Sequence, residues 1–385
     1  MNLYDFFSRP QLQLPLKRET EDIQAFVEST LDQYLHLLPQ LDCPSDLCRE
    51  IRAQQKSIIT FCEGLKTVFS WALKGLSCDA YQKFVEILPI VLPFLDRLTV
   101  ALQKPDQLGI LYRVRQQVTP PLTREGLFHV PFESRHKVAM QRYSVPGLPC
   151  LYLGGSLYTC WCEMGRPPLH ELQVAAFWLR EDKQIKVVNF ANRPKRLLSL
   201  LTPSGDLVDS EKLVDPAGTG PMLVAHVILW PLIALCSIVA KHRRGAFKAE
   251  YILPQFLLQW VAKQKTYDAI CYFSTHVPAV TLPATVPVCN FVFASRDIKA
   301  KGRCSYLRAL FKMTEPASWQ LLRAIQVGPP LPRFIPQFDF EFVEGVTEGY
   351  GSTEFGKVES RLNQLAERIR LKIKQGDMFA GDVAE

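Results

Sequence analysis

The sequence lacks the motifs that identify several common enzyme classes. It contains no Walker-type phosphate loop, and Gly218 and Gly220 are not followed by the third glycine of a dinucleotide-binding fingerprint. It has no HExxH motif and no paired CxxC sets, so we expect no metal site. Ser274 and His276 share one face of an expected strand, but no G-x-S-x-G turn surrounds the serine. These absences argue against a P-loop NTPase, a Rossmann dehydrogenase, a zinc enzyme and a serine hydrolase.

The sequence also lacks the features of an exported protein. Its first residues have neither an apolar core nor a small-residue cleavage site. The 11 cysteines are odd in number and irregularly spaced, as in Cys43-x4-Cys48 and Cys160-x-Cys162. A disulfide framework normally has an even number of cysteines, so we expect reduced thiols and a cytoplasmic protein.

Long apolar runs and strong charge are scarce as well. Only residues 222–240 approach the length of a bilayer span, and His226 and Pro231 interrupt them. A span there would also put Glu163 and Ser274 on opposite sides of a membrane, so we predict a buried helix and no membrane contact. The excess of 7 positive charges is scattered and forms no stripe, which predicts no nucleic-acid partner.

The composition is that of a globular protein, with 48% hydrophobic and 22% charged residues in a chain of 385. Helical periodicity in residues 1–102 predicts an all-helical N-terminal domain that serves as a scaffold or binds a partner. We interpret residues 103–107 as a linker and 108–300 as a catalytic domain of short strands and helices. Residues 301–385 form a C-terminal extension with an amphipathic helix at 356–376, expected to pack on its own core. The predicted fold class is α+β.

The strands expected in the middle of the chain are short and bounded by turn residues. They are residues 109–114, 127–130, 149–154, 175–179, 185–190, 269–274 and 289–294. Residues 298–332 show no clear period and are expected to be irregular. The helical regions on either side of the strands favour a homo-oligomer.

Residues 128–167 hold the densest group of reactive side chains. Arg142 and Tyr143 precede a Pro-Gly turn, and Tyr152 lies in the next expected strand. A Gly-Gly turn follows, its serine is a suitable N-cap, and the helix after it carries Glu163. A guanidinium, a phenol and a carboxylate in one neighbourhood suit an anionic nucleotide whose sugar develops positive charge.

The run QRYSVPGLPCLYLGGSLYTCWCEMG, residues 141–165, resembles the core of the RES-domain family, named for its Arg, Glu and Ser. The motif positions of that family are occupied here by Arg113, Arg142, Tyr152, Glu163 and Ser274. Tyr143 stands where the family usually has Trp or Phe. The resemblance covers roughly residues 108–300 and agrees in order, spacing and local context.

The resemblance implies a fold similar to ADP-ribosyltransferases and NAD+ as the substrate, with no separate cofactor. It also implies a toxin that works beside an antitoxin protein or in phage defence. In this interpretation Arg113 and Arg142 bind the pyrophosphate, since a guanidinium group can donate two parallel hydrogen bonds to phosphate oxygens. Glu163 stabilises positive charge on the nicotinamide ribose as carboxylates do in glycoside cleavage.

The remaining candidates would bind the same dinucleotide. Tyr152 and Tyr143 would contact the nicotinamide or its ribose, and Ser274 would fix the scissile sugar. His129 fits a contact to ribose or phosphate as well as it fits a core position, and both interpretations stay open.

Three functions remain compatible with the sequence. The first is an NAD+ glycohydrolase or phosphorylase, with water or inorganic phosphate as acceptor. The second is an ADP-ribosyltransferase that modifies a protein or a nucleotide, because the motif does not encode the acceptor. The third is a catalytically silent nucleotide-binding module, suggested by the long extensions around the core.

Overall fold

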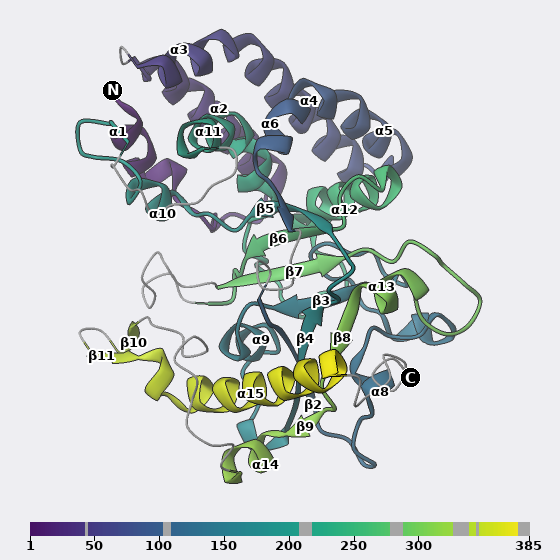
Figure 1. The fold of residues 1–385 in the computed structure, drawn as a ribbon. Coiled ribbons are helices and arrows are strands. Elements are labelled where there is room, and N and C mark those ends of the chain that lie inside the picture. The colour runs from purple at the N-terminus through teal and green to yellow at the C-terminus, as the bar shows by residue number, and fades with distance from the viewer. Residues whose placement is uncertain are drawn as a thin grey trace. The chain divides into compact units, whose positions relative to one another are not determined.

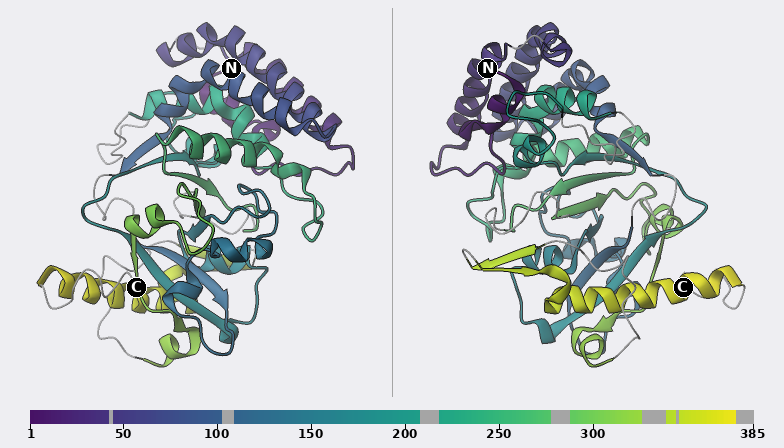
Figure 2. Two further views of the ribbon diagram at one scale, coloured as in Figure 1. Left: turned by 90° about the vertical axis from the view of Figure 1, so that its right-hand side faces the viewer. Right: turned by 60° about the vertical axis from the view of Figure 1, so that its left-hand side comes forward.

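The computed structural model describes residues 1–42, 45–102, 109–207, 218–277, 288–325, 339–343 and 346–375 (Figures 1 and 2). The chain divides into two compact units. Unit 1 comprises Met1–Val100, Ala139–Pro146 and Lys186–Ile270, and unit 2 comprises Ala101–Val138, Gly147–Ile185 and Cys271–Glu385. Both helices and strands are abundant, which confirms the predicted α+β class. The predicted catalytic range 108–300 is therefore divided between the units, because Lys186–Ile270 packs with the N-terminal helices.

Unit 1 is mainly helical. Its helices are α1 (Leu3–Ser8), α2 (Ile23–Leu37), α3 (Asp46–Ala53), α4 (Gln55–Leu73), α5 (Ser77–Ile87), α6 (Leu92–Arg97), α10 (Pro194–Leu198), α11 (Thr219–Cys236) and α12 (Ile252–Gln264). Side-chain caps start three of them: Asn2 accepts from the Asp5 amide at α1, Asp22 from the Ala25 amide at α2, and Ser45 from the Cys48 amide at α3.

Three strands lie where the chain passes between the units: β1 (Thr99–Leu102), β5 (Ile185–Phe190) and β6 (Ala269–Phe273). The expectation of helix up to residue 102 is wrong for the last four residues. The Asn189 amide donates to the carbonyl of Leu98 at 2.9 Å, and the β-branched Thr99 and Val100 suit the pairing of β1 with β5.

Helix α11 is the apolar stretch that passes for a membrane span by length and composition. Within unit 1 it contacts α2, α3, α4, α6 and α12, and 83% of the span is buried. The Tyr34 hydroxyl donates to the carbonyl of Val227 at 2.6 Å, and its ring stacks on Trp230 with 4.9 Å between centroids. The helix therefore occupies the core of unit 1, in agreement with the prediction of a buried helix.

Unit 2 is built on an antiparallel sheet with strand order β7-β3-β2-β4-β8, and β9 also pairs with β4. Its strands are β2 (Leu111–Gln116), β3 (Leu151–Gly154), β4 (Leu172–Leu179), β7 (Cys289–Phe293), β8 (Phe311–Met313) and β9 (Ala317–Ser318), with a separate hairpin of β10 (Asp339–Val343) and β11 (Val346–Gly349). Its helices are α8 (Arg124–Leu127), α9 (Leu157–Glu163), α13 (Ser305–Leu310), α14 (Trp319–Ala324) and α15 (Glu354–Gln375).

Two segments of unit 2 differ from the sequence-based expectation. The strand predicted at 127–130 is absent, because the Thr123 side chain caps α8 by accepting from the Gly126 amide. Residues 298–325, expected to be irregular, contain α13, β8, β9 and α14. Strands β8 and β9 form by pairing with β4, a long-range contact that local periodicity does not reveal; residues 326–332 lie outside the described part.

The long C-terminal helix α15 packs on the sheet of unit 2 (Figure 1). Val358, Leu362 and Ala366 are fully buried in a cluster with residues of β2 and β4. The period of the apolar residues is helical, so a single stripe covers the sheet. This confirms the prediction that the helix covers its own core.

In the described part of the chain, nine cysteines are free thiols and eight of these are buried, whereas Cys48 is disulfide-bonded. The expectation of reduced thiols therefore holds for these nine cysteines and not for Cys48.

Candidate active site

The helix that carries Glu163 is set by its first residues. Ser156 is the N-cap of α9, with extended backbone, and its hydroxyl accepts from the Thr159 amide at 3.1 Å. A Cβ atom on Gly154 would lie 2.5 Å from the Cys160 sulfur, so only glycine allows the helix to approach β3 this closely. Glu163 is the last residue of α9, one turn beyond Cys160.

The carboxylate of Glu163 lies at the centre of a cluster in unit 2. Its Oε1 accepts two hydrogen bonds, from the Ser274 hydroxyl at 2.6 Å and from the Asn290 side-chain amide at 2.7 Å. Its Oε2 lies 3.7 Å from Nε2 of His276. Ser274 and Asn290 are buried, whereas Glu163 and His276 keep 30% and 21% of their side chains exposed. We call Glu163, Ser274, His276 and Asn290 the Glu163 cluster.

The members of the Glu163 cluster come from three parts of the chain. Ser274 directly follows β6, and its amide donates to the carbonyl of Val288 at 2.9 Å. Asn290 lies in β7, where the register places it opposite Gly154 of β3. Because the turn after Gly154 starts α9, the β3–β7 pairing fixes the distance between Asn290 and Glu163.

Tyr152 lies on the same face of β3 as Gly154, since alternate residues of a strand share a face. The register pairs it with Val292, two residues from Asn290, so Tyr152 and Asn290 are on one face of the sheet. The ring of Tyr152 is half-buried. The predicted aromatic contact therefore lies on the face from which Asn290 reaches Glu163.

Arg113 lies where β2 and β3 diverge. These strands pair at Tyr112 and Gly154 only, and beyond this point Nη1 of Arg113 donates to the carbonyl of Tyr152 at 2.6 Å. Burial and the nearby Arg115 lower the pKa of Arg113 well below its usual value. Its buried Nε has no hydrogen-bond partner, and no carboxylate pairs with it among the described residues. Such a guanidinium is suited to an anionic ligand.

The buried Cys160 thiol is influenced by the charges of both Arg113 and Glu163. Burial raises its pKa to about 12, and the charges of Arg113 and Glu163 act on it in opposite directions. Both charged groups are therefore within electrostatic reach of one buried thiol. The high pKa keeps Cys160 protonated, so it is unsuited to nucleophilic attack or metal binding. No group of three metal-ligating side chains occurs among the described residues.

Arg142 and Tyr143 belong to unit 1. Nη1 of Arg142 donates to the carbonyls of Cys236 and Ile238 at 3.0 and 2.9 Å, and its guanidinium lies 4.8 Å from the ring centre of Tyr251. Tyr143 is buried beside it. Arg142 thus binds the carbonyl groups at the C-terminus of α11, where a cation is favoured. These contacts are typical of a structural arginine.

His129 is held at both ring nitrogens. Nδ1 lies 2.8 Å from the carbonyl oxygen of Val130, and Nε2 accepts from the Cys304 amide at 3.0 Å. Burial lowers its pKa, so the neutral tautomer with the proton on Nδ1 fits both contacts. Of the two interpretations left open by the sequence, this geometry favours the core position.

Glu359 of α15 supports α9 from its N-terminal end. Its Oε2 accepts from the Leu157 amide at 3.0 Å and from the Tyr350 hydroxyl at 2.8 Å. Burial raises the pKa of Glu359 to about 7, although these hydrogen bonds and one from Tyr112 favour the charged form. The C-terminal helix therefore positions the helix that ends at Glu163.

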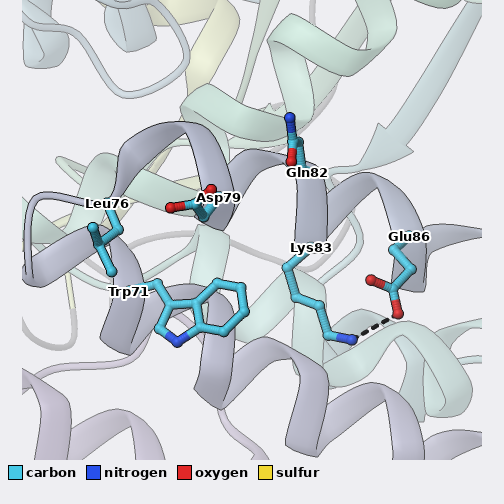
Figure 3. A pocket seen from close by; sticks show the side chains of 6 residues that line it. All are labelled: Trp71, Leu76, Asp79, Gln82, Lys83 and Glu86. Carbon is cyan, nitrogen blue, oxygen red and sulfur yellow. Dashed lines mark hydrogen bonds and ion pairs between the residues drawn. The ribbon is translucent and has the colours of Figure 1, made fainter.

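A separate pocket lies on unit 1, between α4 and α5 (Figure 3). It is lined by Trp71, Leu76, Asp79, Gln82, Lys83 and Glu86. Its cation is paired, because Lys83 Nζ lies 2.7 Å from Glu86 Oε1. The lining is mixed and largely exposed, and it contains no arrangement suited to bond cleavage.

Sequence reasoning did not identify Asn290, and it considered His276 only as a partner for Ser274 in a serine hydrolase. Asn290 sits inside an apolar strand, CNFVF, where a single buried amide is unusual. This single polar residue in an apolar strand is the sequence feature that could have indicated Asn290 as a site residue. Nothing in the local sequence shows that His276 lies near Glu163, because the two are brought together by the tertiary fold.

Taken together, the geometry defines an α+β protein with a partly exposed, hydrogen-bonded carboxylate and, in the same unit, a buried arginine that has no carboxylate partner among the described residues. Comparison with known proteins finds 30% identity over 362 residues to "Putative toxin YopC" of Bacillus subtilis (strain 168), across 91% of this chain and 78% of that protein. The chain belongs to the same family as YopC. No protein-family model matches the chain, and no solved structure matches it.

Proposed function

We propose that the protein is a toxin of the RES-domain type that cleaves the bond between nicotinamide and ribose in NAD+. The name of its relative YopC supports a toxin role. The RES-like motif positions Arg113, Tyr152, Glu163 and Ser274 all lie in unit 2, which supports a shared site. The cleavage chemistry itself rests on the motif and on the geometry of the Glu163 cluster.

The observation that carries the proposal is the hydrogen bond of 2.6 Å between Ser274 and Glu163, two motif residues separated by 111 positions. Together with Asn290, Ser274 fixes Oε1 of the carboxylate. In a side chain that is 30% exposed, Oε2 lies 3.7 Å from Nε2 of His276. It is therefore suited to face the nicotinamide ribose as positive charge develops there.

Arg113 would bind the pyrophosphate of the dinucleotide. A buried guanidinium without a carboxylate partner gains most from an anion, because the low dielectric strengthens the interaction. Tyr152 would place its half-buried ring against the nicotinamide or its ribose.

In the reaction, the carbon–nitrogen bond breaks and its electron pair leaves with the nicotinamide nitrogen, which becomes neutral. The remaining ADP-ribosyl cation is stabilised by Glu163 until an acceptor adds. A toxin of this kind acts on the NAD+ of a cytoplasm and requires an antitoxin in the cell that makes it.

The test is incubation of the purified full-length protein with NAD+, with and without inorganic phosphate, and identification of the products by mass spectrometry. We expect stoichiometric release of nicotinamide by the wild type and roughly 1,000-fold slower release by Glu163→Gln. Stable NAD+ in both samples would overturn the proposal. An ADP-ribose adduct on protein in a treated lysate, with little free ADP-ribose, would instead support the transferase alternative.

A further inference from the structure

We propose that His276 is a catalytic residue that binds and deprotonates a water molecule, which makes the enzyme a glycohydrolase. This inference rests on the proposed function and adds to it the acceptor and the general base. It is carried by the position of the His276 imidazole beside Oε2 of Glu163, the oxygen proposed to face the substrate.

The distance between the two groups suits a shared water molecule. Nε2 of His276 and Oε2 of Glu163 are 3.7 Å apart, which is too long for a direct hydrogen bond. An oxygen atom at roughly 2.8 Å from both atoms completes a triangle between them. A water in this position would donate one proton to each group, and its lone pairs would remain available for the ribose carbon.

The backbone on both sides of His276 is fixed. The Ser274 hydroxyl donates to Glu163 and accepts from the His276 amide at 3.1 Å, so one hydroxyl joins the carboxylate to this backbone. On the other side, Val277 is buried in a cluster with Tyr158 of α9. The backbone contacts therefore hold His276 near Glu163. The His276 side chain is 21% exposed, which leaves room for solvent.

The proton and electron balance is complete with NAD+ and water alone. The carbon–nitrogen bond breaks toward nicotinamide, the water oxygen forms the new bond to the ribose carbon, and neutral His276 takes the proton from that water. The histidine then releases the proton to solvent. The products are nicotinamide, ADP-ribose and one proton.

The first experiment compares wild type with His276→Ala and His276→Gln, using steady-state nicotinamide release. We expect kcat to fall by roughly 100-fold or more in both variants, as for loss of a general base, with KM for NAD+ changed little. Wild type with saturating phosphate should still give ADP-ribose. An unchanged kcat in folded variants, or ADP-ribose phosphate as the wild-type product, would overturn the inference.

The second experiment separates a base from a structural residue by adding sodium azide to His276→Ala. Azide carries no proton, so it needs no base and should restore nicotinamide release with ADP-ribosyl azide as product. Absence of rescue in a variant that keeps the wild-type melting temperature would contradict the role of His276. Wild type without any NAD+ turnover would instead refute the proposed function, so the two failures are distinguishable.

Discussion

Arg113 in unit 2 and Arg142 in unit 1 are both more than nine-tenths buried, but their guanidinium groups are held differently. Arg142 binds two carbonyl groups and lies over an aromatic ring. Arg113 has one hydrogen bond to a carbonyl and a buried Nε without a partner. Complete pairing indicates a structural role, whereas a buried donor without a partner leaves a place for a ligand. The contrast is therefore between one guanidinium in unit 1 that is bound by carbonyl groups and a ring, and one in unit 2 that is only partly paired.

The largest effect that this contrast predicts is on catalysis. We expect Glu163→Gln to lower kcat for NAD+ cleavage by roughly 1,000-fold, because an amide cannot stabilise the developing cation. The stability of unit 2 should change little, since the amide oxygen still accepts from Ser274 and Asn290. Steady-state assays and thermal melting measure the two quantities. A variant with near wild-type kcat would remove the Glu163 cluster from the active site.

A second prediction concerns pH and stability. The pKa of Glu359 is about 7 in the folded protein and 4.5 in an unfolded chain. Between these values the folded state keeps a proton that the unfolded state has lost, so stability falls as pH rises from about 4.5 to 7. The full difference corresponds to about 3 kcal/mol. Glu359→Gln should gain this amount relative to wild type between pH 4.5 and 7.

His226 in unit 1 is a matched control, because its pKa shift changes stability with pH in the opposite direction. Burial lowers the pKa of His226 in α11 from 6.5 to about 3. The unfolded chain therefore binds a proton that the folded protein does not, and the free energy of unfolding decreases as pH falls through this range. Hydrogen exchange followed by mass spectrometry reports α9 and α11 separately. Equal pH responses of the two helices in wild type and in Glu359→Gln would contradict the assignment of the raised pKa to Glu359.

The third prediction compares the two arginines directly. Arg142→Lys should destabilise unit 1 by about 2 kcal/mol, because it removes a guanidinium from two buried carbonyl groups, and should leave KM unchanged. Arg113→Lys should raise KM for NAD+ by about 10-fold or more with a smaller change in stability. Chemical denaturation and initial-rate kinetics of both variants check this. The reverse assignment, with KM raised only by Arg142→Lys, would refute the comparison.

The smallest effect is expected at Asn290. Asn290→Leu removes one of the two hydrogen bonds to Oε1 of Glu163 and leaves that of Ser274. We expect kcat to fall by about 10-fold, corresponding to about 1.4 kcal/mol for a hydrogen bond to a charged group. Ser274→Ala is the matched variant. If both variants kept full activity, the orientation of Glu163 would not depend on these contacts.

Local patterns in the sequence predicted much of this fold. The capping serine after the Gly-Gly turn, the strand at 185–190 and the amphipathic C-terminal helix are all present, because caps and periodicity act within a few residues. The prediction of a strand at 127–130 was wrong, since the Thr123 cap favours helix α8 at this point. Strands β8 and β9 depend on pairing with β4, which no local pattern encodes.

The candidate site was only partly visible in the sequence. Motif spacing indicated Glu163 and Ser274 but not their direct hydrogen bond, and it did not separate the role of Arg113 from that of Arg142. Asn290, His276 and Glu359 come from distant segments and act through three-dimensional contacts. Such partners become visible only once the tertiary packing is known.

The most direct test of the central claim is a crystal structure of the Glu163→Gln variant with NAD+ bound. The account predicts that the reactive ribose carbon lies within about 4 Å of the side chain at position 163, with the pyrophosphate at Arg113. A dinucleotide bound elsewhere, with its nicotinamide ribose away from Ser274 and residue 163, would contradict it.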